Sequence, residues 1–151
     1  MLRLTNLADY AVVVMTAAAR APEGSLSAGV VATRTGIPAP TVAKIMGLLT
    51  RGQLLASTRG VAGGFRLAKL PHAISVADIV EAVDGPIALT NCQHGPESDH
   101  LSACALEGSC AVRPHWQPIN VAVRAALAAV TLADLAGPVA VPTALSIEVL
   151  A

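Results

Sequence analysis

The chain has 151 residues with ten basic and ten acidic side chains, and 54% of its residues are hydrophobic. This composition excludes a largely disordered chain, and the length suits one domain with its own core. Aromatic residues make up only 2%, so the apolar content is mainly Ala, Val and Leu, which favours packed helices. The longest apolar stretch, residues 10–19, is well short of the roughly 18 residues of a spanning helix. We therefore expect a cytoplasmic protein with no membrane partner.

Charge is distributed unevenly along the chain. Residues 1–70 carry eight basic and two acidic side chains, a net charge of +6, and the remaining residues carry a net charge of −6. A basic half of this kind suits a polyanion such as nucleic acid, and the alternative is a solvated basic face without a partner.

The first half of the chain predicts three helices. The first runs over residues 6–20 behind Thr5 or Asn6 as N-cap, the second runs from Ser27 to Gly36, and the third opens near Pro40 and closes at Gly52. Two extended runs, residues 54–59 and 65–68, follow and are joined by a glycine-rich connection typical of a hairpin. This order predicts a winged helix-turn-helix with a two-stranded wing.

The second half predicts two longer helices separated by an irregular segment. A helix spans residues 75–84 behind a capping box of Ser75 and Asp78, and an Ala-rich helix spans residues 115–130. Between them, residues 86–111 form a loop that contains all three cysteines. Loops of this length are usually functional or disordered. A short last helix begins at Thr131, and the fold class is therefore mainly α.

The third helix is the recognition helix of the predicted helix-turn-helix, whose N-terminal residues reach base edges in the major groove. Pro40 and Thr41 lie in its first turn, Lys44 shares the outward face, and Arg51 suits a phosphate near the far end. Arg59 and Gly60, at the wing tip, suit a minor groove. The alternative is a packing scaffold without DNA, but the basic charge lies on this unit.

The cysteines, Cys92, Cys104 and Cys110, have the spacing C-x11-C-x5-C. Their odd number in a cytoplasmic protein argues against disulfides, and no close pair of the zinc-knuckle kind is present. Three thiolates on a loop can hold an iron-sulfur cluster, whose fourth donor need not be cysteine. A thiol redox sensor and inert cysteines are the alternatives. His94 and His100 lie in the same loop as further possible donors, although solvated histidines are the commoner case.

Three stretches of the chain resemble the Rrf2 family of winged-helix transcriptional regulators. These are residues 1–11 (MLRLTNLADYA), 59–68 (RGVAGGFRLA) and 79–86 (IVEAVDGP), with the cysteine loop at the expected place. Within the family, residues 84–89 (DGPIAL) and 104–110 (CALEGSC) most resemble the regulators of the SUF iron-sulfur assembly system. The resemblance covers residues 1 to about 135.

The resemblance implies a homodimer that binds a double-stranded DNA operator and senses an iron-sulfur cluster, 2Fe–2S or 4Fe–4S. It implies a winged helix-turn-helix domain at residues 1–85, a cluster-binding cysteine loop at 86–113, a dimerisation helix and short helix at 114–136, and a flexible tail at 137–151.

The fourth cluster ligand is the point at which this chain departs from part of the family. Regulators of the IscR type have a histidine three residues after the last cysteine, whereas this chain has Arg113 there and His115 two positions later. In regulators of the NsrR type the ligand is an aspartate of the first helix, supplied by the partner subunit, and Asp9 occupies that position. The alternative for Asp9 is a helix-start charge favoured by the helix dipole.

We therefore expect a cluster-sensing transcription regulator of iron-sulfur assembly genes, without enzymatic activity. One alternative is a regulator that senses thiol oxidation or nitric oxide through its cysteines. A second, from another class, is an iron-sulfur scaffold or carrier protein with a basic face.

Overall fold

The computed structural model describes residues 3–21, 26–60, 63–90 and 109–137. Its first three helices are α1 (Asn6–Ala19), α2 (Ala28–Thr35) and α3 (Ala39–Arg51). The side chains of Thr5 and Ser27 cap α1 and α2 by accepting from the backbone N–H groups of Ala8 and Val30. The three expected helices are confirmed to within a residue or two of their bounds.

The wing is an antiparallel pair of strands, β1 (Leu55–Thr58) and β2 (Gly64–Leu67), in which Ala56 pairs with Arg66. A short 3-10 helix at Pro71–Ala73 leads to α4 (Val76–Asp84). The expected capping box is present, since the Asp78 carboxylate accepts from the Ser75 N–H and hydroxyl at 2.8 and 2.7 Å. Burial raises the pKa of Asp78, but these hydrogen bonds together with the nearby charges of Lys69 and Arg124 hold the pKa below its ordinary value.

The last two helices take different directions. Helix α5 (Arg113–Ala128) is the expected long helix, and α6 (Leu132–Ala136) follows it behind the N-cap Thr131. Helix α6 returns to the first helices, where Leu132 is fully buried and its N–H donates to the Ile74 carbonyl at 2.7 Å. Arg20, the C-cap of α1, donates to the Leu135 carbonyl near the end of α6 at 3.1 Å.

One main core holds this body together. It is formed where α1, α2, α3, α4, the wing and α6 meet, and its fully buried members include Val14, Met15, Val31, Ile45, Met46, Leu49, Ile79 and Leu132. Side chains at spacings of three and four residues line its walls, as the helical periodicity predicts. Helix α5 takes little part, because none of its residues is buried.

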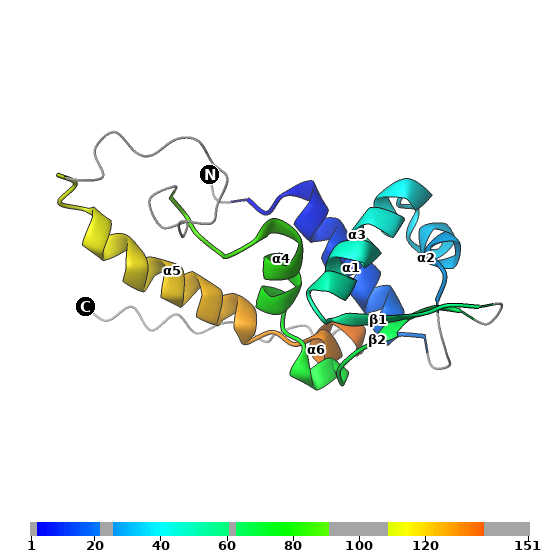
Figure 1. Ribbon diagram of the computed structural model, residues 1–151. Coiled ribbons are helices and arrows are strands. Elements are labelled where there is room, and N and C mark those ends of the chain that lie inside the picture. Colours follow the sequence, from blue (N-terminus) through cyan, green and yellow to red (C-terminus); the bar gives the residue numbers. More distant parts are fainter. Residues whose placement is uncertain (1–2, 22–25, 61–62, 91–108, 138–151) are drawn as a thin grey trace.

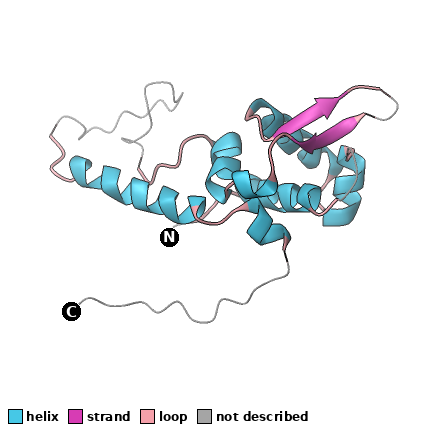
Figure 2. Ribbon diagram, turned by 90° about the horizontal axis from the view of Figure 1, so that it is seen from below, coloured by secondary structure: helices cyan, strands magenta, loops and turns pink. Residues whose placement is uncertain are grey.

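Figures 1 and 2 show a body built from α1–α4, the wing and α6, with α5 extending away from it toward one end of the molecule. The wing lies at the opposite end. No helix in the described part of the chain is long and apolar enough to cross a membrane. The predicted flexible tail lies outside the described residues except for Gly137.

Candidate nucleic-acid interface and cysteine segment

Helix α3 has two faces of opposite character. Val42, Ile45, Met46 and Leu49 are buried in the core, whereas Pro40, Lys44 and Arg51 are exposed and Thr41 is half-buried. Pro40 and Lys44 are four residues apart, which places them on one side of the helix. The outward face of α3 therefore presents the residues that the sequence predicts for DNA contact.

The wing presents the other predicted contacts. Arg59 and Gly60 follow the last strand pair, Thr58 with Gly64, and both are exposed. Gly60 has φ of 114°, a conformation that other residues rarely adopt. The Gly63 N–H donates to the Gly60 carbonyl at 2.8 Å, and a Cβ at Gly63 would clash with the Thr58 carbonyl oxygen. Backbone packing thus requires glycines where the wing turns.

A contact that sequence patterns do not predict fixes the wing against α2. Leu26, next to the N-cap of α2, and Phe65 of β2 exchange two backbone hydrogen bonds of 2.8 and 2.9 Å. Both side chains pack in the main core. The bridge joins residues far apart in the chain, so the wing is held in a fixed position against the helix-turn-helix.

The stretch that forms α2, α3 and the wing is strongly cationic. From residue 26 to residue 70 the chain contains no Asp or Glu, and it contains six basic residues: Arg34, Lys44, Arg51, Arg59, Arg66 and Lys69. All six are exposed. Among the described residues, no carboxylate forms an ion pair with any of them. Arg34 and Arg66 extend the predicted contact set, and the missing carboxylates are the signal that could have identified them.

The predicted cluster ligands are only partly described. Cys92 and Cys104 lie outside the described residues, as do His94 and His100. Cys110 is half-buried just before α5, and its carbonyl accepts from the Arg113 N–H at 3.3 Å. His115 is exposed in the first turn of α5. In the described part of the chain, no three His, Cys, Asp or Glu side chains come close enough together to hold a metal ion.

Asp9 is exposed in the first turn of α1, and Cys110 precedes the far end of α5. This end of α5 extends away from the body that contains α1 (Figure 1). A 16-residue helix is about 24 Å long, and Cys110 precedes the end of α5 that extends from the body. The Cys110 thiolate and the exposed Asp9 carboxylate are both groups that can bind iron.

The C-terminal half of α5 is attached to α4 and the segment after it. Arg124 donates to both carboxylate oxygens of Glu81 at 2.9 Å, which raises the pKa of Arg124, and the Asn120 side chain accepts from the Leu89 N–H at 3.0 Å. The N-terminal half carries exposed apolar side chains, since Ile119 is 43% exposed.

Comparison with known proteins agrees with this architecture. Residues 4–138 match the Rrf2 family, described as "Iron-dependent Transcriptional regulator". The chain is 30% identical over 135 residues to the HTH-type transcriptional regulator IscR of Aliivibrio salmonicida, covering 89% of this chain and 77% of that one.

Two solved structures share the fold. CymR, described as the global cysteine regulator of B. subtilis, superposes with a TM-score of 0.68 and 28% identity, covering 90% of this chain and 97% of that one. T. potens IscR superposes with a TM-score of 0.65 and 24% identity, covering 89% and 85%. The family consists of transcriptional regulators and not of enzymes, as expected. The winged-helix fold, the extent of the match and these relatives together show that the chain belongs to the Rrf2 family of HTH-type transcriptional regulators.

Proposed function

We propose that this regulator is a cytoplasmic homodimer that binds operator DNA and changes its affinity with the state of an iron-sulfur cluster held by its cysteines, and that its targets are iron-sulfur assembly genes. The observation that carries the DNA contacts is the exposed basic charge of the stretch that forms α2, α3 and the wing. Six exposed basic side chains and no carboxylate along residues 26–70 match the phosphate backbone.

The contacts follow from this arrangement. Pro40, Thr41 and Lys44 at the start of α3 enter the major groove, and Arg51 at its end binds a phosphate. Arg59 reaches into the adjacent minor groove, and Gly60 lets the wing backbone approach the DNA. In this division of the chain, residues 1–85 bind DNA, 86–113 sense the signal, and 114–136 hold the dimer together.

Helix α5 supports the dimer. The helix and its N-cap carry one apolar stripe, whose members follow at spacings of three and four residues: Val112, Trp116, Ile119, Val123 and Leu127. Val123 and Leu127 face the α4 side, whereas Val112 and Ile119 are 54% and 43% exposed. A second copy of α5 packed on this stripe would bury it, and two-fold symmetry would place the two recognition helices on one side of the dimer.

The cysteine segment supports cluster sensing, together with the family description as iron-dependent. Cys92, Cys104 and Cys110 would supply three thiolates, and Asp9 of the partner subunit would supply an oxygen donor. Arg113 cannot supply the fourth ligand, because a guanidinium has no lone pair to offer. Helix α5 extends away from the body that contains α1 (Figure 1), and this arrangement favours an aspartate ligand from the second copy. Whether the cluster is bound would depend on iron and oxygen.

DNA binding is tested by the salt dependence of the dissociation constant for a near-palindromic duplex. We expect a steep linear fall of log affinity with log salt concentration, with a slope set by the number of neutralised phosphates. Arg59→Ala should weaken binding and reduce the slope, whereas the control Arg113→Ala removes the same charge outside this stretch and should change neither. A slope near zero for the wild type contradicts the DNA contacts.

Cluster binding is tested by iron and sulfide analysis and absorption spectra of anaerobically purified protein. Ser in place of any of the three cysteines should abolish the cluster, and Asp9→Ala should leave it assembled but faster to decay in air. If His115→Ala loses the cluster and Asp9→Ala resembles the wild type, the imidazole is the ligand. Iron-free protein whose DNA affinity responds to oxidants or nitric oxide would identify a thiol sensor instead.

A further inference from the structure

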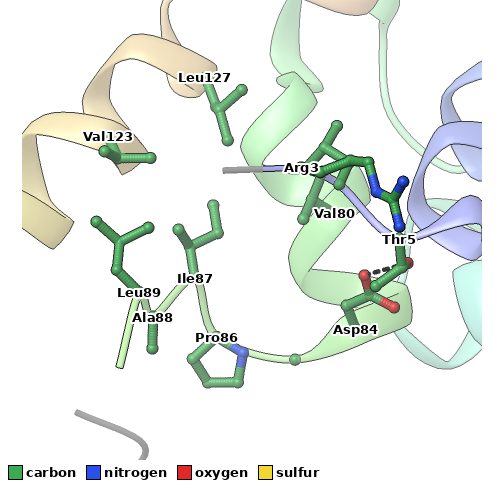
Figure 3. A pocket seen from close by; sticks show the side chains of 12 residues that line it. Arg3, Thr5, Val80, Asp84, Pro86, Ile87, Ala88, Leu89, Val123 and Leu127 are labelled. Atoms are coloured by element: carbon green, nitrogen blue, oxygen red, sulfur yellow. Dashed lines mark hydrogen bonds between the residues drawn. The ribbon is translucent and has the colours of Figure 1, made fainter. Parts of the chain in front are cut away.

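The N-cap of α1 is bonded to the end of α4. The Thr5 hydroxyl accepts from the Ala8 N–H at 3.1 Å, and it donates to the Asp84 carboxylate at 2.6 Å (Figure 3). Thr5 is the cap of the helix that carries Asp9, and Asp84 is the last residue of α4. One hydroxyl therefore joins the start of α1 to the point where the chain leaves α4 for the cysteines.

The segment that follows Asp84 is held at both ends. Gly85, with φ of 84°, turns the chain out of α4, and Leu89 is fastened to α5 by Asn120 at 3.0 Å. Cys92 comes three residues after Leu89. A displacement of Leu89 would therefore act on a short segment whose other end is the Thr5–Asp84 hydrogen bond.

Between its two anchors the segment is not closely packed. Gly85–Leu89 border a cavity of about 490 Å³, across which Ile87 and Leu89 face Val123 and Leu127 of α5 (Figure 3). Close-packed interiors resist displacement, whereas a segment beside an open cavity has room for a second arrangement. The segment therefore has room to move between Asp84 and Leu89.

We propose that the hydrogen bond between Thr5 and Asp84 is the link by which cluster binding in the cysteine loop changes the position of α1, and with it the affinity for DNA. This inference rests on the sensing function proposed above. Helix α1 packs directly on α3 through Ala11, Val14 and Met15 in the main core. A shift at its first turn therefore reaches the recognition helix through rigid contacts. Thr5 and Asp84 are positioning residues and touch neither DNA nor cluster.

The test separates this link from simple capping. Thr5→Asp keeps a strong N-cap but replaces the donor by a carboxylate that repels Asp84. Adding Asp84→Asn to it restores a hydrogen bond with donor and acceptor exchanged. The matched control is Thr131→Asp, because the Thr131 hydroxyl also caps a helix and donates to a carboxylate, Asp134, at 2.6 Å, but within α6 alone.

The readout is the ratio of dissociation constants, cluster-free over cluster-loaded, for one operator duplex measured anaerobically by fluorescence anisotropy. The cluster is assembled from ferrous iron and sulfide. Allosteric ratios commonly lie between about 5 and 150. We expect Thr5→Asp to bring the ratio about fivefold closer to one, the double variant to restore it, and Thr131→Asp to leave it at the wild-type value.

The outcomes distinguish this link from the sensing function itself. A wild-type ratio that differs from one, together with an unchanged ratio in Thr5→Asp, overturns the link and leaves cluster sensing intact. A double variant that stays as uncoupled as Thr5→Asp also overturns it. A wild-type ratio of one, or a chain that binds no cluster, overturns both.

Discussion

The contact between the end of α3 and α4 sets how the proposed recognition helix is held, and one glycine permits it. A Cβ at Gly52 would lie 2.7 Å from the Cβ of Ala82. Carbon atoms in contact lie about 3.5–4.0 Å apart, so the helices must separate by about 1 Å to accept it. The obstacle is a methyl group fixed to a helix backbone and cannot rotate away. We expect Gly52→Ala to lower the free energy of unfolding by about 1–3 kcal/mol.

Gly47→Ala is the matched control, because it adds the same methyl group to the same helix. A Cβ there meets nothing within 4 Å. Replacing a helix glycine by alanine should raise the free energy of unfolding by about 0.5–1 kcal/mol. Urea and thermal unfolding followed by far-UV circular dichroism resolve the pair, since each kcal/mol shifts the Tm of a chain of this size by about 2–4 °C.

A double variant shows that the clash with Ala82 is the cause. Adding Ala82→Gly to Gly52→Ala removes the opposing methyl, so the two changes together should cost less than the sum of their separate effects. Shifts of the same sign and size for Gly52→Ala and Gly47→Ala would refute the reasoning, as would strictly additive effects in the double variant.

Three further results are expected. The pKa values of Asp78 and Asp134 lie below their ordinary 3.8 in the folded chain. The two ionised carboxylates therefore stabilise the fold fully above that pH, and this stabilisation is lost as the pH falls through the folded pKa values. The Tm should fall over the same pH range, and Asp78→Asn should flatten the profile. Leu132→Ala, at a fully buried site, should lower the free energy of unfolding by about 2–5 kcal/mol in urea titrations. Inserting about half a helical turn between operator half-sites should abolish tight binding in anisotropy titrations, because both recognition helices must meet the same face of the duplex; unchanged affinity would contradict the dimer.

The local features of this protein follow from its sequence. Helix bounds, the capping boxes of Ser75 and Thr131 and the glycine-rich wing depend on residues within a few positions of one another, so their patterns predict them. The outward face of α3 is predictable for the same reason, because spacing alone separates Lys44 from the buried Ile45. The cationic character of residues 26–70 is likewise visible from composition.

Contacts between distant residues were decided only by the tertiary structure. The Leu26–Phe65 bridge, the return of Leu132 to the main core and the Thr5–Asp84 hydrogen bond each join residues far apart in the chain. No periodicity encodes such pairs, because they depend on how the core orients whole elements against one another. The uncovered stripe on α5 has the same origin. Its sequence resembles that of any helix with a core-facing side, and only the packing of α4 shows that Val123 and Leu127 face the body while Val112 and Ile119 stay 54% and 43% exposed.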